Sequence, residues 1–181
     1  MQPEEQLIND LRLGSNDAFA ELYQQYKQAV YFFCLKLCAD RMLAEDAAHD
    51  TFLRVRDHIT TLHDNALFKS WMYAIARNSS FKLIAQTRRN GTLDEELVWS
   101  DSSPLAELEA EDQAVIVRRC ITHLKVEYRE VIHLREYENL SYEEIARITG
   151  DTESSVKSRL FKARKALGEQ LKPYFKERGD R

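Results

Sequence analysis

The residues best suited to chemistry lie in the segment SSVKSRLFKARKAL, residues 154–167, which holds five basic residues and no acidic one. A helical period would place Val156, Leu160, Ala163 and Leu167 on one side of this segment. The other side then presents hydroxyl groups in the first turn and basic side chains further along. Hydroxyl groups can reach base edges or phosphates, and basic side chains neutralise phosphates. The segment is therefore typical of a helix that binds nucleic acid.

The residues before this segment supply the turn of a helix-turn-helix. Ser141 and Glu144 have the S-x-x-E spacing of a capping box, which predicts a short helix that ends at Gly150. Asp151 or Thr152 can cap the following helix. Two helices joined in this way predict a unit that binds the DNA major groove, although a solvated amphipathic helix with a basic stripe is the alternative. The predicted DNA-facing residues are Ser154, Ser155, Lys157, Ser158, Arg159, Phe161, Lys162, Arg164 and Lys165.

The sequence holds no other grouping of residues that matches a catalytic or metal-binding pattern. Its five histidines show no HExxH spacing, and G-x-S-x-G and P-loop motifs are missing. Cys34, Cys38 and Cys120 are an odd number without CxxC spacing, which excludes a disulfide framework and argues against a metal site. We therefore expect buried thiols, no metal, no cofactor and no enzymatic activity.

Composition and charge predict an all-α protein with two small helical domains. Only 5 glycines and 3 prolines occur in 181 residues, too few for the turns of a β-sandwich. Residues 1–92 carry 11 basic and 11 acidic residues, residues 93–112 carry 8 acidic and no basic ones, and residues 113–181 carry 15 basic and 11 acidic ones. The acidic stretch is typical of a linker, although a solvated surface loop is the alternative. We predict domains at 1–92 and 113–181 with an acidic linker at 93–112.

The sequence also predicts a cytoplasmic protein without a membrane segment. The longest apolar run, residues 29–35, is far shorter than the roughly 20 residues needed to span a bilayer. The acidic and polar start, MQPEEQLIND, lacks the basic and apolar regions of a signal peptide.

Apolar periodicity predicts three helices in the first domain. The first follows a cap at Ser15-Asn16-Asp17, the second runs from about Leu43 to Ile59, and the third from about Leu67 to Arg89. The third helix has a basic C-terminal half, in which we expect Asn78, Ser79, Ser80 and Gln86 to be exposed. In the second domain a helix from about Tyr128 to Tyr137 precedes the helix-turn-helix.

Three segments resemble the extracytoplasmic-function (ECF) sigma factors of bacteria, the smallest members of the sigma-70 family. LSYEEIARITGDTESSVKSRLFKARKAL, residues 140–167, is similar to region 4.2, which reads the promoter -35 element. LAEDAAHDTFLRV, residues 43–55, is similar to region 2.2, which binds the clamp helices of the largest polymerase subunit. FKSWMYAIARNSSFKLIAQTRR, residues 68–89, resembles regions 2.3 and 2.4, which open and read the -10 element.

The resemblance implies a non-catalytic subunit that directs core RNA polymerase to promoter DNA under the control of an anti-sigma factor. It implies core-polymerase binding by Asp46, His49, Asp50, Phe52, Leu53 and Arg54. It implies -10 contacts by Trp71, Arg77, Asn78, Lys82, Arg88 and Arg89, with a flipped base held beside the loop at residues 61–68. The alternative is a stand-alone helix-turn-helix regulator, which would leave the segment SWMYAIARN and the basic half that follows it unexplained.

Limited proteolysis tests the linker. If residues 93–112 connect two domains, a protease should cut there first and leave two folded helical fragments. Mass spectrometry of the fragments would locate the cut. A single protected core over the whole chain would argue against two domains, unless the domains pack together in the free protein.

Overall fold

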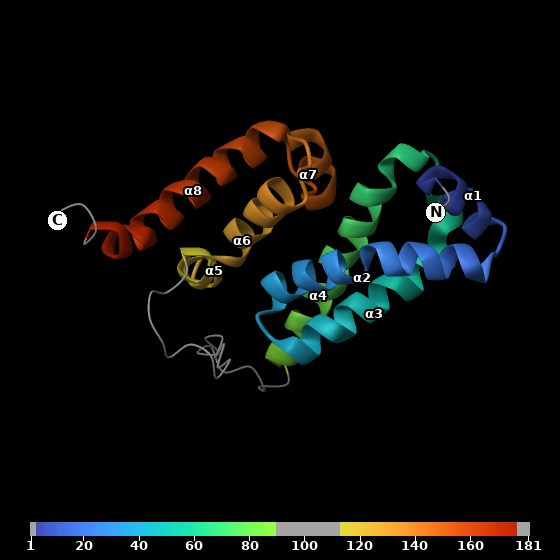
Figure 1. The fold of residues 1–181 in the computed structure, drawn as a ribbon, viewed down its shortest axis with the longest axis horizontal. Coiled ribbons are helices and arrows are strands. Elements are labelled where there is room, and N and C mark those ends of the chain that lie inside the picture. Colours follow the sequence, from blue (N-terminus) through green and yellow to red (C-terminus); the bar gives the residue numbers. More distant parts are fainter. Residues whose placement is uncertain (1–2, 90–112, 177–181) are drawn as a thin grey trace.

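The computed structural model describes residues 3–89 and 113–176, and every regular element among them is helical (Figure 1). The first half contains α1 (Glu4–Arg12), α2 (Asn16–Cys38), α3 (Arg41–His58) and α4 (Phe68–Arg89). The second half contains α5 (Gln113–Thr122), α6 (Val126–Ile132), a π-helical turn (His133–Tyr137), α7 (Tyr142–Thr149) and α8 (Glu153–Lys176). The predicted all-α fold is confirmed, whereas the predicted linker at 93–112 lies outside the described residues. No helix in the described part is long and apolar enough to cross a membrane.

The first half is a bundle in which α2, α3 and α4 pack on one another and α1 covers α2. Side chains fix where the long helices begin: Ser15 Oγ accepts from the Ala18 amide at 3.2 Å, and Asp40 Oδ1 accepts from the Leu43 amide at 2.8 Å. Large side chains that are almost wholly buried fill the centre. They include Phe33, Phe68, Met72 and Tyr73.

Two features of this bundle differ from the sequence prediction. Helix α1 was not predicted, because only Leu7, Ile8 and Leu11 form its buried face within a short polar segment. The predicted exposure of Ser79 and Ser80 is wrong, since both are buried. Small hydroxyl side chains fit between packed helices when they find acceptors, and here Ser80 donates to the Ala76 carbonyl at 2.8 Å.

The three cysteines are buried without disulfides, as the sequence predicts. Burial raises the pKa of Cys34 to about 12 and that of Cys38 to about 11. Such thiols stay protonated and behave as small apolar side chains.

The second half contains the predicted helix-turn-helix, formed by α7 and α8. Ser141 Oγ accepts from the Glu144 amide at 3.1 Å, and the Glu144 carboxylate accepts from the Ser141 amide at 2.7 Å, so the capping box is confirmed. Gly150 ends α7 with φ of 74°, a left-handed conformation that favours glycine. Of the two caps predicted for α8, Thr152 accepts from the Ser155 amide at 3.2 Å.

The helix predicted from about Tyr128 to Tyr137 is present but not uniform. It begins two residues earlier as α6 and continues from His133 to Tyr137 as the π-helical turn. Apolar spacing alone does not distinguish these two windings. Helix α5 was not predicted.

The two halves are docked against each other, with α6 beside α2 and α7 beside α4 (Figure 1). One apolar core continues through both of them. Arg129 of α6 joins them at the end of α2, where its Nε donates to the Lys36 carbonyl at 2.7 Å and its Nη2 to the Leu37 carbonyl at 3.3 Å. These carbonyls belong to the last turn of α2, where capping groups from outside a helix commonly bind. The halves are therefore distinct helical units that pack as one body.

Replacing Ser141 by alanine tests the capping box. The change should lower the free energy of unfolding by about 1 kcal/mol, because the Glu144 amide in the first turn of α7 loses its acceptor, Ser141 Oγ. Urea denaturation would measure the difference. Ser158→Ala, on the exposed face of α8, is the matched control and should change stability by less than about 0.5 kcal/mol. Equal effects of the two changes would contradict the structural role of the cap.

Candidate nucleic-acid interface

The predicted DNA-binding face of α8 is open to solvent. Val156, Leu160 and Ala163 point into the core, so the opposite side of the helix is left free of packing. Phe161 is 71% exposed, which is unusual for a large aromatic side chain. The other exposed members of this face are Ser154, Lys157, Ser158, Lys162, Arg164 and Lys165. Ser155 and Arg159 are half-buried.

The cations on α8 differ in how strongly they are already paired. Arg159 lies 2.8 Å from Asp151, and Arg164 lies 2.6 Å from Glu136. Lys157 lies 3.5 Å from Glu153 and 5.2 Å from the centre of the Tyr142 ring. Lys162 and Lys165 form no ion pair within the described residues. These two lysines are the cations best placed to bind phosphate without first leaving an internal partner.

The predicted polymerase-binding residues lie along α3 and divide into exposed and structural ones. Asp46 and His49 are exposed, while Leu53 and Arg54 are half-buried. Phe52 is buried, with its ring centre 4.8 Å from that of Tyr23, so it acts through packing.

Asp50 has two partners inside the protein. It accepts hydrogen bonds of 2.7 Å from Ser79 of α4 and 2.7 Å from Arg54. Burial alone would raise the pKa of Asp50, but the hydrogen bonds from Ser79 and Arg54 outweigh it and lower the pKa. Asp50 is therefore an ionised link between α3 and α4 as well as a candidate contact.

The predicted -10 residues lie on α4, and the structure separates them into two groups. Asn78, Lys82, Arg88 and Arg89 are exposed. Trp71 is half-buried against Phe68, with ring centres 6.2 Å apart. Arg77 lies over the Phe81 ring at 4.8 Å, and its Nε donates to Glu130 of α6 at 2.6 Å. The second half thus already occupies one of the cations predicted to contact DNA.

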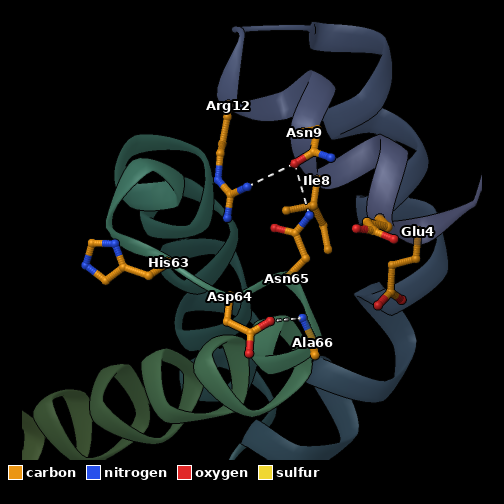
Figure 2. A pocket seen from close by; sticks show the side chains of 9 residues that line it. Glu4, Ile8, Asn9, Arg12, His63, Asp64, Asn65 and Ala66 are labelled. Carbon is orange, nitrogen blue, oxygen red and sulfur yellow. Dashed lines mark hydrogen bonds between the residues drawn. The ribbon is translucent and has the colours of Figure 1, made fainter.

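The loop predicted to hold a flipped base lines a cavity of about 550 Å³ together with α1 (Figure 2). Asn9 Oδ1 accepts from Arg12 and from Asn65, each at 3.0 Å, which ties the helix to the loop. Asp64 accepts from the Ala66 amide at 2.9 Å and shapes the loop locally. The Asn65 amide oxygen is shielded and has no hydrogen-bond partner among the described residues. The contribution of α1 to this wall was missed, because nothing in its sequence suggests a pocket.

No group of three or more metal-ligating side chains that could hold an ion occurs in the described part of the chain. The surfaces available are therefore a basic helical face, an outward charged helical face and a polar cavity. These surfaces can bind macromolecules through charge and hydrogen bonds.

Comparison with known proteins assigns both halves. Residues 22–90 match the family model "Sigma-70 region 2", and residues 114–167 match "Sigma-70, region 4". The ECF RNA polymerase sigma factor SigM of Bacillus subtilis is 31% identical over 152 residues, covering 81% of this chain and 91% of that protein. The sigma factor SigW of the same organism is 29% identical over 177 residues, covering 91% and 95%.

A solved structure gives the same result for the fold. The sigma factor RpoE of Bartonella quintana, in complex with the anti-sigma factor NepR, matches with a TM-score of 0.70 and 25% identity, covering 90% of this chain and 98% of that one. The chain belongs to the ECF sigma factors of the sigma-70 family. Its function is that of an RNA polymerase sigma factor in transcription initiation.

Substitutions on α8 should separate phosphate binding from base reading. Lys165→Ala should weaken binding about equally on all sequences and reduce the salt slope by roughly 1, because it removes one phosphate contact. Lys157→Ala, in the first turns of α8, should cost ~1–3 kcal/mol and relax preference at one or two -35 positions. Arg159→Ala should show the same pattern only if Arg159 leaves Asp151 on binding DNA.

The measurement compares these variants, assembled with core polymerase, on a randomised -35 library at two salt concentrations. Lys172→Ala is the matched control, since Lys172 is bound to Glu169 at 2.6 Å and lies beyond the helix-turn-helix contact region. The first-turn variants could instead lose affinity while their sequence preference stays unchanged. That result would contradict direct base reading and would indicate recognition of DNA shape.

Proposed function

We propose that the three surfaces divide the work of promoter recognition. Helix α3 binds core polymerase, α4 and the adjoining cavity bind the -10 element, and α8 binds the -35 element. The observation that carries this proposal is the exposed, acid-free basic face of α8 on a capped helix-turn-helix, in a protein with a net charge of -4. A protein with a negative net charge and local basic faces needs a further source of affinity, which core polymerase supplies.

The geometry of α8 supports the -35 role. A helix-turn-helix points the first turns of its second helix at base edges and its flanks at the phosphates. Ser154, Lys157 and Ser158 occupy those first turns, whereas Lys162 and Lys165 follow further along the exposed side. Phe161 offers an apolar ring that suits a thymine methyl group.

The -10 role is supported by the cavity beside the 61–68 loop and by the cations of α4. A base that leaves the stack needs a polar pocket for its edge and cations for its backbone. The polar residues Asn9, Asp64 and Asn65 line the cavity, and Lys82, Arg88 and Arg89 offer exposed positive charges on α4.

We infer that a protein of the anti-sigma class regulates this chain. The support is that the Bartonella quintana relative is held in complex with an anti-sigma factor and shares its fold over most of its length. The chain itself acts as a binding subunit without catalysis. It works in the cytoplasm, where polymerase and promoter DNA meet.

Run-off transcription with purified core polymerase on genomic fragments tests the function directly. Addition of the protein should start transcription from a defined set of sites, which sequencing of the transcripts identifies. A stand-alone regulator would bind DNA without core polymerase and would start no transcript. That result would overturn the proposal.

Asp46→Lys tests the polymerase face. Asp46 is exposed on α3, so its replacement should leave helicity unchanged while it weakens association with core by about tenfold or more, through the loss of one interfacial charge and the gain of its opposite. We prefer it to a change at Asp50, which also holds Ser79 and Arg54. Glu21→Lys, exposed on α2, is the control with the same change in charge. If both variants co-elute with core polymerase equally well, this end of α3 does not belong to the interface.

A further inference from the structure

Two cations of α4 are held by carboxylates of the second half. Arg77 Nε lies 2.6 Å from Glu130 Oε1, and the Glu130 side chain is 1% exposed. Lys69 Nζ lies 3.2 Å from Glu138 Oε2 and also donates to the Glu138 backbone carbonyl at 2.8 Å. Glu138 is only 11% exposed. Both pairs span the contact between the halves, and in both the cation comes from α4.

Neither pair resembles an ordinary surface ion pair. Exposed pairs contribute little because water screens them, as with Glu143 and Arg147 within α7. Burial makes Glu130 and Glu138 depend on their cations, since an unpaired carboxylate in such a place is strongly disfavoured. The two ion pairs therefore stabilise the closed arrangement, in which Arg77 faces α6 and Lys69 faces the end of the π-helical turn.

Apolar contacts and Arg129 reinforce the same arrangement. His133 of the π-helical turn lies against Phe33 of α2, with ring centres 5.6 Å apart, and Arg129 binds the last carbonyls of α2. The exposed face of α8 takes no part in this contact. The closed arrangement thus covers part of the predicted -10 surface and leaves the predicted -35 surface open.

We propose that Glu130 and Glu138 form an intramolecular latch that competes with DNA phosphates for Arg77 and Lys69, so that the free protein must open before α4 binds promoter DNA. This inference rests on the proposed role of α4. Two carboxylates offer α4 the same kind of ligand as a nucleic-acid backbone, namely anionic oxygens at hydrogen-bond distance. A partner that separates the halves, such as core polymerase, would expose both cations together.

The latch is tested with Glu130→Gln/Glu138→Gln in the full chain. Glutamine keeps the size of each side chain and removes its charge, so the fold should persist while the closed state loses both ion pairs. The control double variant, Glu143→Gln/Glu169→Gln, makes the same change in net charge. Its two carboxylates are exposed and pair within the second half with Arg147 and Lys172, neither of which lies on the predicted DNA-binding face.

Two measurements are made on each protein. Small-angle X-ray scattering gives the radius of gyration, and fluorescence anisotropy gives the affinity for a single-stranded oligothymidine in low salt. If the closed state outweighs the open one by about ten to one, release should raise the apparent affinity about tenfold over the control. The radius of gyration should rise at the same time. Adding Arg77→Ala to the latch variant should abolish part of the gain in affinity.

The outcomes separate the latch from the proposed function. An unchanged radius and an unchanged affinity overturn the latch, while run-off transcription by the same variant shows that the proposed function stands. A larger radius without a gain over the control overturns the role of α4 in binding DNA, and with it the competition. If the latch variant is not folded by circular dichroism, Glu138→Gln against Glu143→Gln gives the same comparison at the less buried pair.

Discussion

The arrangement of this protein depends on one buried carboxylate, that of Glu130. It lies on α6, is 1% exposed and is neutralised by Arg77 from α4. Burial raises the pKa of Glu130, and the nearby Arg77 opposes that rise. A carboxylate in such surroundings requires a cation beside it, so the pair ties α6 to α4 at one place. Apolar packing alone would be less selective, because it has no direction.

The other contacts between the halves follow from this position of α6. Arg129, one residue before Glu130, reaches the last turn of α2 and donates hydrogen bonds to two of its carbonyls. Positive charge at the C-terminus of a helix is also favoured by the helix dipole. Further along, Glu138 follows the π-helical turn and meets Lys69. Burial would raise the pKa of Glu138, but its neighbours His133, Tyr73 and Lys69 outweigh that effect and bring the pKa to about 2.

Local signals in the sequence predict most of the helices and the helix-turn-helix, because those signals act over a few residues. Ser141, Glu144 and Gly150 determine α7, and the spacing of Val156, Leu160 and Ala163 determines which side of α8 is exposed. The docking of the halves could not be predicted in this way. Arg77 and Glu130 are 53 positions apart, so their pairing leaves no periodic pattern. The burial of Ser79 was missed for a related reason, since its partner Asp50 comes from another helix.

The candidate site was predictable to the same extent. The sequence shows which residue types lie on which helix face, but it does not show which cations are already held in ion pairs. A cation that is already paired with a buried carboxylate must give up that pair to bind a DNA phosphate. Its net contribution to the binding free energy is therefore only the difference between the two ion pairs. A solvated cation such as Lys162 or Lys165 gives up no ion pair, so the counterions that it releases from DNA contribute fully to the binding free energy. Arg77 and Lys69 on α4 belong to the first kind, and the lysines along α8 to the second. In the proposed latch, the closed protein would therefore bind DNA mainly through α8, and α4 would bind DNA only after the second half has moved away from it.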